Sequence, residues 1–130
     1  MKALTFKQPW AGLIIDGYKN VENRSRPTSW PKRICVHAGK SWWTGPEADN
    51  MPDSPHQHYA GFVIGTVDVV GCVCGYRSRW AEPGYWHWIL RNPLPLRSPI
   101  EMPGHQYWFE VPDECLPLRH LSELSPRRHR

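Results

Sequence analysis

Hydrophobic and polar residues change their spacing several times along the chain, and the first change falls near the N-terminus. Residues 3–6 predict a short β-strand. Apolar positions then gather in a broad stripe over Trp10–Ile15, directly after Pro9, whose missing N–H suits the first turn of a helix. Gly17 stands where a left-handed residue closes a helix. The pattern therefore predicts one helix of about two to three turns.

The remainder of the chain is dominated by β-branched and aromatic runs separated by turn residues. These runs predict strands over residues 18–24, 33–38, 61–73, 85–90 and 107–111. Residues 39–59 predict a long connection with one helical turn near 46–50. The longest strand contains three glycines that indicate bulges, Gly61, Gly65 and Gly71. We expect an α+β, mainly β fold: a small, mostly antiparallel barrel with one N-terminal helix and short additional helical turns.

Composition limits the size and class of the domain. A chain of 130 residues has room for one core, so we expect a single domain over residues 1–121 and a basic C-terminal tail over 122–130. The 14 prolines disfavour a helix bundle. No apolar run is long enough to span a bilayer and no signal-peptide pattern opens the chain, so we expect a cytoplasmic protein without a membrane partner.

Charge and cysteine content change this picture little. The formal net charge of +4 is a weak form of the basic character expected of a nucleic-acid binder. Cys35, Cys72 and Cys74 lie in or beside predicted strands, which indicates buried thiols rather than disulfides. The pairs Cys72-x-Cys74 and His56-x-His58 lack the spacing of a zinc ribbon or finger. We therefore predict no metal site and no cofactor.

Two segments near the N-terminus carry the most specific motifs. They are "QPWA", at residues 8–11, and the pattern Gly17-x-Lys19-x-x-Glu22-x-Arg24. With the later stretches "ICVHAGK", "GTVDVVGCV" and "ILRNP", the chain resembles the ASCH domain, a relative of the PUA fold, from Leu4 to about Leu118.

The resemblance implies a β-barrel with a basic cleft between the first helix and the barrel, where RNA or a modified nucleoside binds. The residues that fall on the family's cleft are Gln8, Trp10, Lys19, Glu22 and Arg24, with His37 and Lys40 on the neighbouring strand end. Lysine and arginine contact phosphate, a carboxylate accepts from the amine of cytosine, and an aromatic face stacks on a base. We expect single-stranded RNA, a nucleoside or a nucleotide as partner, with DNA as an alternative.

Several of these residues also have simpler interpretations. Glu22 and Arg24 would form an ordinary surface ion pair if both were exposed, Trp10 lies on the apolar stripe of the helix, and His37 suits a structural role in a strand. A surface patch of tryptophans and prolines would instead suit a protein-binding module.

The alternative to binding is a small hydrolase that acts through Lys19 and Glu22, either as a ribonuclease or as an acetylcytidine amidohydrolase. Lys19 matches the lysine of the amidohydrolase branch, but Glu22 stands where that branch has a nucleophilic threonine, and a carboxylate cannot replace a hydroxyl in the same mechanism. Lys19 near Glu22 would also keep the carboxylate ionised, which favours recognition over proton transfer.

Overall fold

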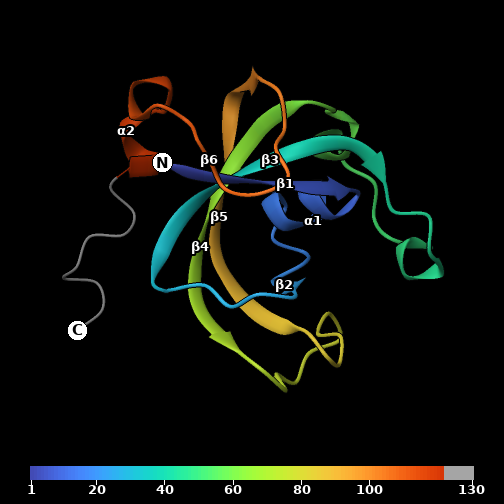
Figure 1. Ribbon diagram of the computed structural model, residues 1–130. Coiled ribbons are helices and arrows are strands. Elements are labelled where there is room, and N and C mark those ends of the chain that lie inside the picture. The colour runs from blue at the N-terminus through green and yellow to red at the C-terminus, as the bar shows by residue number, and fades with distance from the viewer. Residues whose placement is uncertain (122–130) are drawn as a thin grey trace.

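The computed structural model describes residues 1–121, and the predicted basic tail lies outside them. The elements run β1 (Lys2–Gln8), α1 (Trp10–Ile15), β2 (Val21–Arg24), β3 (Lys32–Trp42), η1 (Pro46–Ala48), η2 (Pro55–His58), β4 (Phe62–Val73), β5 (Trp86–Glu101), β6 (Phe109–Glu110), η3 (Asp113–Cys115) and α2 (Leu118–Leu121) (Figure 1). None of the helices in this part of the chain is long and apolar enough to cross a membrane.

The strands form one six-stranded sheet in the order β2-β5-β4-β3-β1-β6. Only the pairing of β1 with β3 is parallel, while the other four pairings are antiparallel. Figure 1 shows β4 and β5 as long, bent strands beside each other. The mainly β fold is therefore confirmed, although no ladder joins β2 to β6 within residues 1–121 to close the sheet into a barrel.

The predicted limits of the strands at residues 85–90 and 107–111 were wrong. β5 continues through three prolines to Glu101, whereas β6 contains only two residues. The pairing of β4 with β5 shifts register at three places, and such irregularities let a strand accommodate proline. One shift lies at Gly65, where a Cβ atom would approach the carbonyl oxygen of Leu94 to 2.6 Å. Glycine is needed at this position because the backbones of β4 and β5 run so close together that a side chain would not fit.

The segment after α1 also differs from its prediction. The strand was expected to begin at Tyr18, but β2 begins at Val21. The backbone N–H groups of Tyr18 and Lys19 both donate to the carbonyl oxygen of Leu13, at 2.9 and 3.0 Å. Gly17 adopts the predicted left-handed conformation, with a φ of 81°. This helix end brings Lys19 back toward α1 before the strand starts.

The larger part of the core lies between α1 and the sheet. All of α1 except its first residue is buried, and it packs with apolar residues of the four longest strands. Cys35 is buried as predicted, and burial raises the pKa of its thiol to about 12. Cys74 is exposed because β4 ends one residue before it, so the prediction of a buried thiol was wrong at that position.

A buried polar network crosses the sheet on β3, β4 and β5. Arg33 Nη1 donates to Asp68 Oδ1 at 2.6 Å, and both side chains are 3% exposed. Arg33 Nε donates to Thr66 Oγ1 at 3.0 Å, and Asn92 Nδ2 donates to Asp68 Oδ2 at 2.8 Å. These hydrogen bonds compensate for removing two charged groups from water.

Candidate functional site

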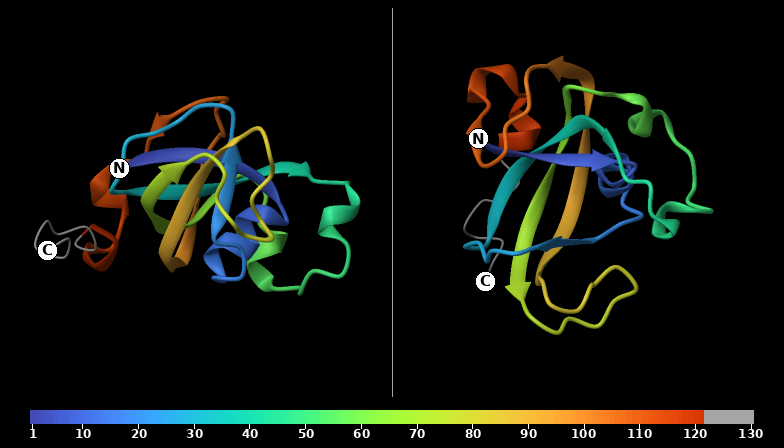
Figure 2. Two further views of the ribbon diagram at one scale, coloured as in Figure 1. Left: turned by 90° about the horizontal axis from the view of Figure 1, so that it is seen from below. Right: turned by 45° about the vertical axis from the view of Figure 1, so that its right-hand side comes forward.

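A cleft of about 660 Å³ opens beside α1 and β2. Its walls come from β1, α1, β2 and the connections that follow β3 and β4. The right view of Figure 2 shows these two connections extending on the same side of the sheet as α1. The residues that line the cleft are Thr5, Phe6, Lys7, Trp10, Lys19, Glu22, Asn23, Arg24, Trp43, Glu47, Met51, Arg79, Trp80, Glu82 and Tyr85.

One wall of the cleft is a row of charged side chains on and before β2. Glu22 is central: its Oε2 accepts from Arg24 Nε at 2.8 Å, and its Oε1 lies 3.5 Å from Lys19 Nζ. Lys19 Nζ also donates to the carbonyl oxygen of Val21. The side chains of Lys19 and Glu22 are only 6% and 14% exposed. The ion pair between Lys19 and Glu22 is therefore better shielded from solvent than an ion pair on the exposed surface.

Aromatic rings form the facing walls. The ring centroid of Trp10 lies 6.3 Å from that of Trp80 and 6.4 Å from that of Trp43. Tyr18 packs edge-on against Trp80 at 5.6 Å. Lys19 Nζ lies 5.7 Å from the Trp10 ring and 5.9 Å from the Trp80 ring, within the range of cation–π attraction. The charged row and the rings thus meet at Lys19.

The structure brings together four of the seven residues that the resemblance placed at the site: Trp10, Lys19, Glu22 and Arg24. Gln8 does not line the cleft. It is fully buried, where its Oε1 accepts from the backbone N–H of Gly12 at 2.9 Å and its Nε2 donates to the carbonyl oxygens of His56 and Tyr59. Gln8 holds α1 against η2 and so supports one wall of the cleft from behind.

His37 and Lys40 also lie outside the cleft lining. His37 is buried, with Nδ1 3.1 Å from Thr5 Oγ1 and Nε2 2.7 Å from the carbonyl oxygen of Met102. Burial lowers the pKa of His37, so the neutral ring is favoured. Lys40 is exposed near the end of β3.

Sequence reasoning missed the contribution of the β4–β5 connection. Arg79, Trp80, Glu82 and Tyr85 all line the cleft from this segment. Asn23 of β2 holds it in place, because its Nδ2 donates to the carbonyl oxygen of Trp80 and its Oδ1 accepts from the N–H of Glu82, both at 2.9 Å. The available signal was the stretch "RSRW" at residues 77–80, which places arginines and a tryptophan in a connection.

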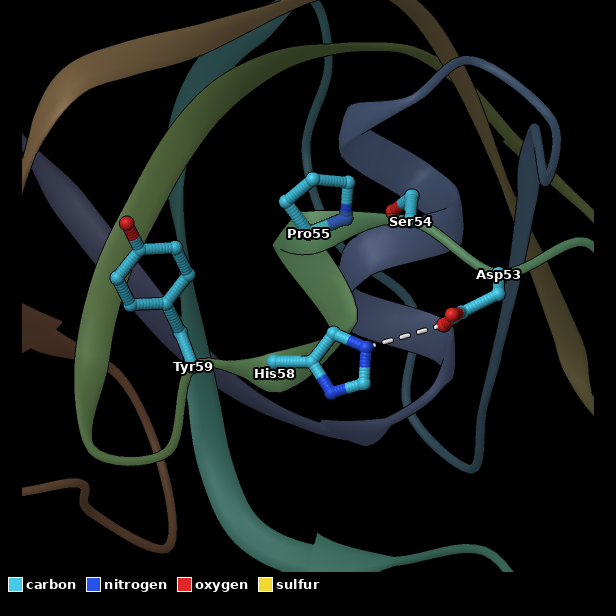
Figure 3. Close-up of a pocket in the computed structure, with 5 residues that line it drawn as sticks. All are labelled: Asp53, Ser54, Pro55, His58 and Tyr59. Atoms are coloured by element: carbon cyan, nitrogen blue, oxygen red, sulfur yellow. Dashed lines mark hydrogen bonds and ion pairs between the residues drawn. The ribbon is translucent and has the colours of Figure 1, made fainter.

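A second hollow, of about 490 Å³, lies along η2 (Figure 3). Its lining residues are Asp53, Ser54, Pro55, His58 and Tyr59. Figure 3 shows Asp53 facing His58, with Nε2 and Oδ1 3.1 Å apart, while the ring of Tyr59 points away from the pair. Both members of the pair are largely exposed. This hollow is shallow and built from one short segment, so the cleft is the better candidate for a binding site.

Burial of Lys19 should appear in the pH dependence of stability. Burial lowers the pKa of Lys19 below the ordinary value of 10.5, while the Glu22 charge partly opposes the shift. The unfolded chain then retains a proton that the folded chain has lost, so stability rises with pH between the folded pKa and 10.5. We expect Lys19→Met to remove this rise. Urea unfolding of the wild type, Lys19→Met and the exposed-site control Lys40→Met should show it. A pH-independent difference between wild type and Lys19→Met would contradict the prediction.

The mainly β sheet with a short helix beside it is the PUA-like fold of ASCH domains. The chain belongs to the ASCH domain family, whose sequence model matches residues 4–99. Among solved structures, ASCH from Zymomonas mobilis is 18% identical, with a TM-score of 0.59, and the match covers 95% of this chain and 94% of that chain.

Two variants of the Zymomonas protein match over the same shares of both chains. A tyrosine-to-phenylalanine variant is 18% identical with a TM-score of 0.58, and a serine-to-alanine variant is 19% identical with a TM-score of 0.56. At these identities the likeness shows the common fold.

Proposed function

We propose that this ASCH domain binds RNA or a nucleoside by holding one base in the cleft. The observation that carries the proposal is the meeting of stacking surfaces and hydrogen-bonding charges in one cavity. Trp10 and Trp80 supply the rings, and the row of Lys19, Glu22 and Arg24 supplies donors and acceptors. Stacking on aromatic rings combined with hydrogen bonds to base edges is the usual mode of recognition of unpaired bases.

The roles of the charged residues follow from their chemistry. Glu22 accepts a hydrogen bond from an exocyclic amine, such as that of cytosine. Arg24 and Lys19 donate to a carbonyl oxygen of the base, and Lys7 and Arg79 contact phosphate. Four basic and three acidic side chains line the cleft, so its formal net charge is small. Base contacts therefore contribute more to affinity at this cavity than phosphate neutralisation does.

Calorimetric titration tests this proposal. The ligands are a panel of nucleosides that includes acetylcytidine, together with short single-stranded RNAs, each titrated at two salt concentrations. We expect at least one nucleoside to bind with an affinity that changes little with salt, because it carries no phosphate. RNA binding should weaken as salt rises, because phosphate contacts release counterions. Folded protein that binds none of these ligands would overturn the proposal.

Hydrolysis of RNA or of a modified nucleoside is the second candidate. The observation in its favour is the amine of Lys19, which is buried beside Glu22, faces the cleft and has a lowered pKa. A lysine amine with a lowered pKa suits proton transfer. Mass spectrometry of the titrated ligands separates the candidates: a cleaved or deacetylated product that Glu22→Gln no longer forms, while it still binds the ligand, would establish an enzyme. Intact ligands support recognition alone.

A further inference from the structure

A second group of aromatic and basic side chains lies outside the cleft. Arg26 lies in the β2–β3 connection, Lys32 begins β3, and Tyr107 and Trp108 lie just before β6. The guanidinium of Arg26 lies 5.4 Å from the Tyr107 ring centroid, and Lys32 Nζ lies 4.8 Å from that of Trp108. We call these four residues the aromatic–basic ridge. The left view of Figure 2 shows the β2–β3 connection and the segment before β6 on the same side of the molecule.

The ridge is continuous with the cleft through Trp88. The ring of Trp108 stacks on that of Trp88 at 5.8 Å with an interplanar angle of 12°. On its cleft side, Trp88 lies 5.9 Å from the guanidinium of Arg24, which lines the cleft. Trp88 Nε1 also donates to the carbonyl oxygen of Arg26 at 3.0 Å. Contacts therefore run without a break from the cleft wall to the ridge.

No carboxylate among the described residues forms an ion pair with the basic side chains of the ridge. Within residues 1–121, neither Arg26 nor Lys32 forms an ion pair, and Lys32 Nζ donates only to the neutral Thr28 Oγ1, at 2.8 Å. The adjoining rings are accessible, since Tyr107 is 58% and Trp108 is 36% exposed. Cations without carboxylate partners beside accessible rings suit a ligand that carries both negative charge and flat aromatic groups.

We propose that the aromatic–basic ridge binds nucleotides adjacent to the one whose base occupies the cleft, so that the ligand is a single-stranded RNA of several nucleotides. This inference rests on the proposed function of the cleft. Exposed rings stack on successive unpaired bases, and the cations contact the phosphates between them. Tyr107 and Trp108 stack on bases, while Arg26 and Lys32 neutralise the backbone. Because the net charge of the cleft is small, Arg26 and Lys32 of the ridge provide the positive charge that attracts the RNA backbone.

The test compares a nucleoside with an oligonucleotide. The probes are cytidine, followed by calorimetry, and a fluorescein-labelled mixed-sequence RNA of about twelve nucleotides, followed by anisotropy. The ridge variants are Tyr107→Ala and Arg26→Gln. The control is Arg97→Gln, which removes the same charge from an exposed arginine of β5 outside the ridge. Circular dichroism melts verify that each variant is folded.

We expect Tyr107→Ala to weaken RNA binding at least about five-fold. Arg26→Gln should also reduce the slope of log affinity against log salt by about 0.7, the value for one phosphate contact with a single strand. Neither variant should alter the response to cytidine, and Arg97→Gln should leave RNA affinity unchanged. A lost phosphate contact changes the salt slope, whereas a merely structural effect of the substitution would not.

The outcomes separate the ridge from the cleft. RNA binding that is equally tight in the wild type and both ridge variants would overturn the ridge proposal but would not contradict the proposal for the cleft. Weaker RNA binding in the ridge variants, with no loss in the cleft variant Trp80→Ala, would support the ridge and show that the Trp80 ring does not stack on the base. Wild-type protein that binds no RNA would overturn the ridge proposal directly.

Discussion

Asp68→Asn should be the most destabilising single substitution considered for this fold, with a loss of about 3–5 kcal/mol in the free energy of unfolding. Asp68 is buried and accepts from both Arg33 and Asn92. The introduced amide has one oxygen in place of two, so either Arg33 or Asn92 loses its acceptor. Arg33, whose side chain is buried, also keeps a charge without an opposing carboxylate. Removing one partner of a buried pair is costly for this reason.

Urea unfolding and thermal melting followed by circular dichroism measure this effect. A loss of this size should lower the melting temperature by about 10 °C or more. The control is Glu110→Gln, which removes a carboxylate of similar chemistry from an exposed pair with Lys2, at 3.0 Å. We expect the control to change stability little, because solvent and salt screen exposed pairs. Equal effects of the two substitutions would show that the buried network does not stabilise the sheet.

The candidate site could be predicted from the sequence only where its residues are close along the chain. Glu22 and Arg24 lie two positions apart in a strand, so they share one face and meet at 2.8 Å. Lys19 joins them because the α1 end turns the chain back at Gly17. Trp80 could not be placed in this way, since its position depends on a hydrogen bond to Asn23, 57 residues earlier. No local pattern records such a contact.

The same distinction explains the fold. The helix end at Gly17 was predictable because one residue adopts a positive φ that glycine tolerates. The length of β5 was not, because the prolines at 93, 95 and 99 are locally typical of strand ends. Pairing with a bulged β4 overrides that preference. Gln8 differs from both examples. The resemblance implied that Gln8 lines the cleft, but the structure places its amide in the wall behind the cleft, where it bonds to the backbone of Gly12.

Trp80→Ala should cause the largest loss of ligand affinity among the cleft variants, roughly ten-fold or more for a nucleoside. Trp80 contacts Trp10, Tyr18 and Lys19 with its ring, so it forms much of the stacking surface. Its backbone carbonyl oxygen accepts from Asn23, and that hydrogen bond persists in the alanine variant. The β4–β5 connection should therefore keep its position while the ring is lost.

Calorimetry with the favoured nucleoside of the panel measures the loss, and two further variants make it specific. Trp80→Phe retains a ring and should recover most of the affinity, which a purely structural loss of the connection would not predict. Trp42→Ala removes a tryptophan that is 49% exposed and does not line the cleft, so it should bind as the wild type does. Unchanged affinity in folded Trp80→Ala would remove this ring from the site and leave Trp10 and Trp43 as the remaining stacking surfaces.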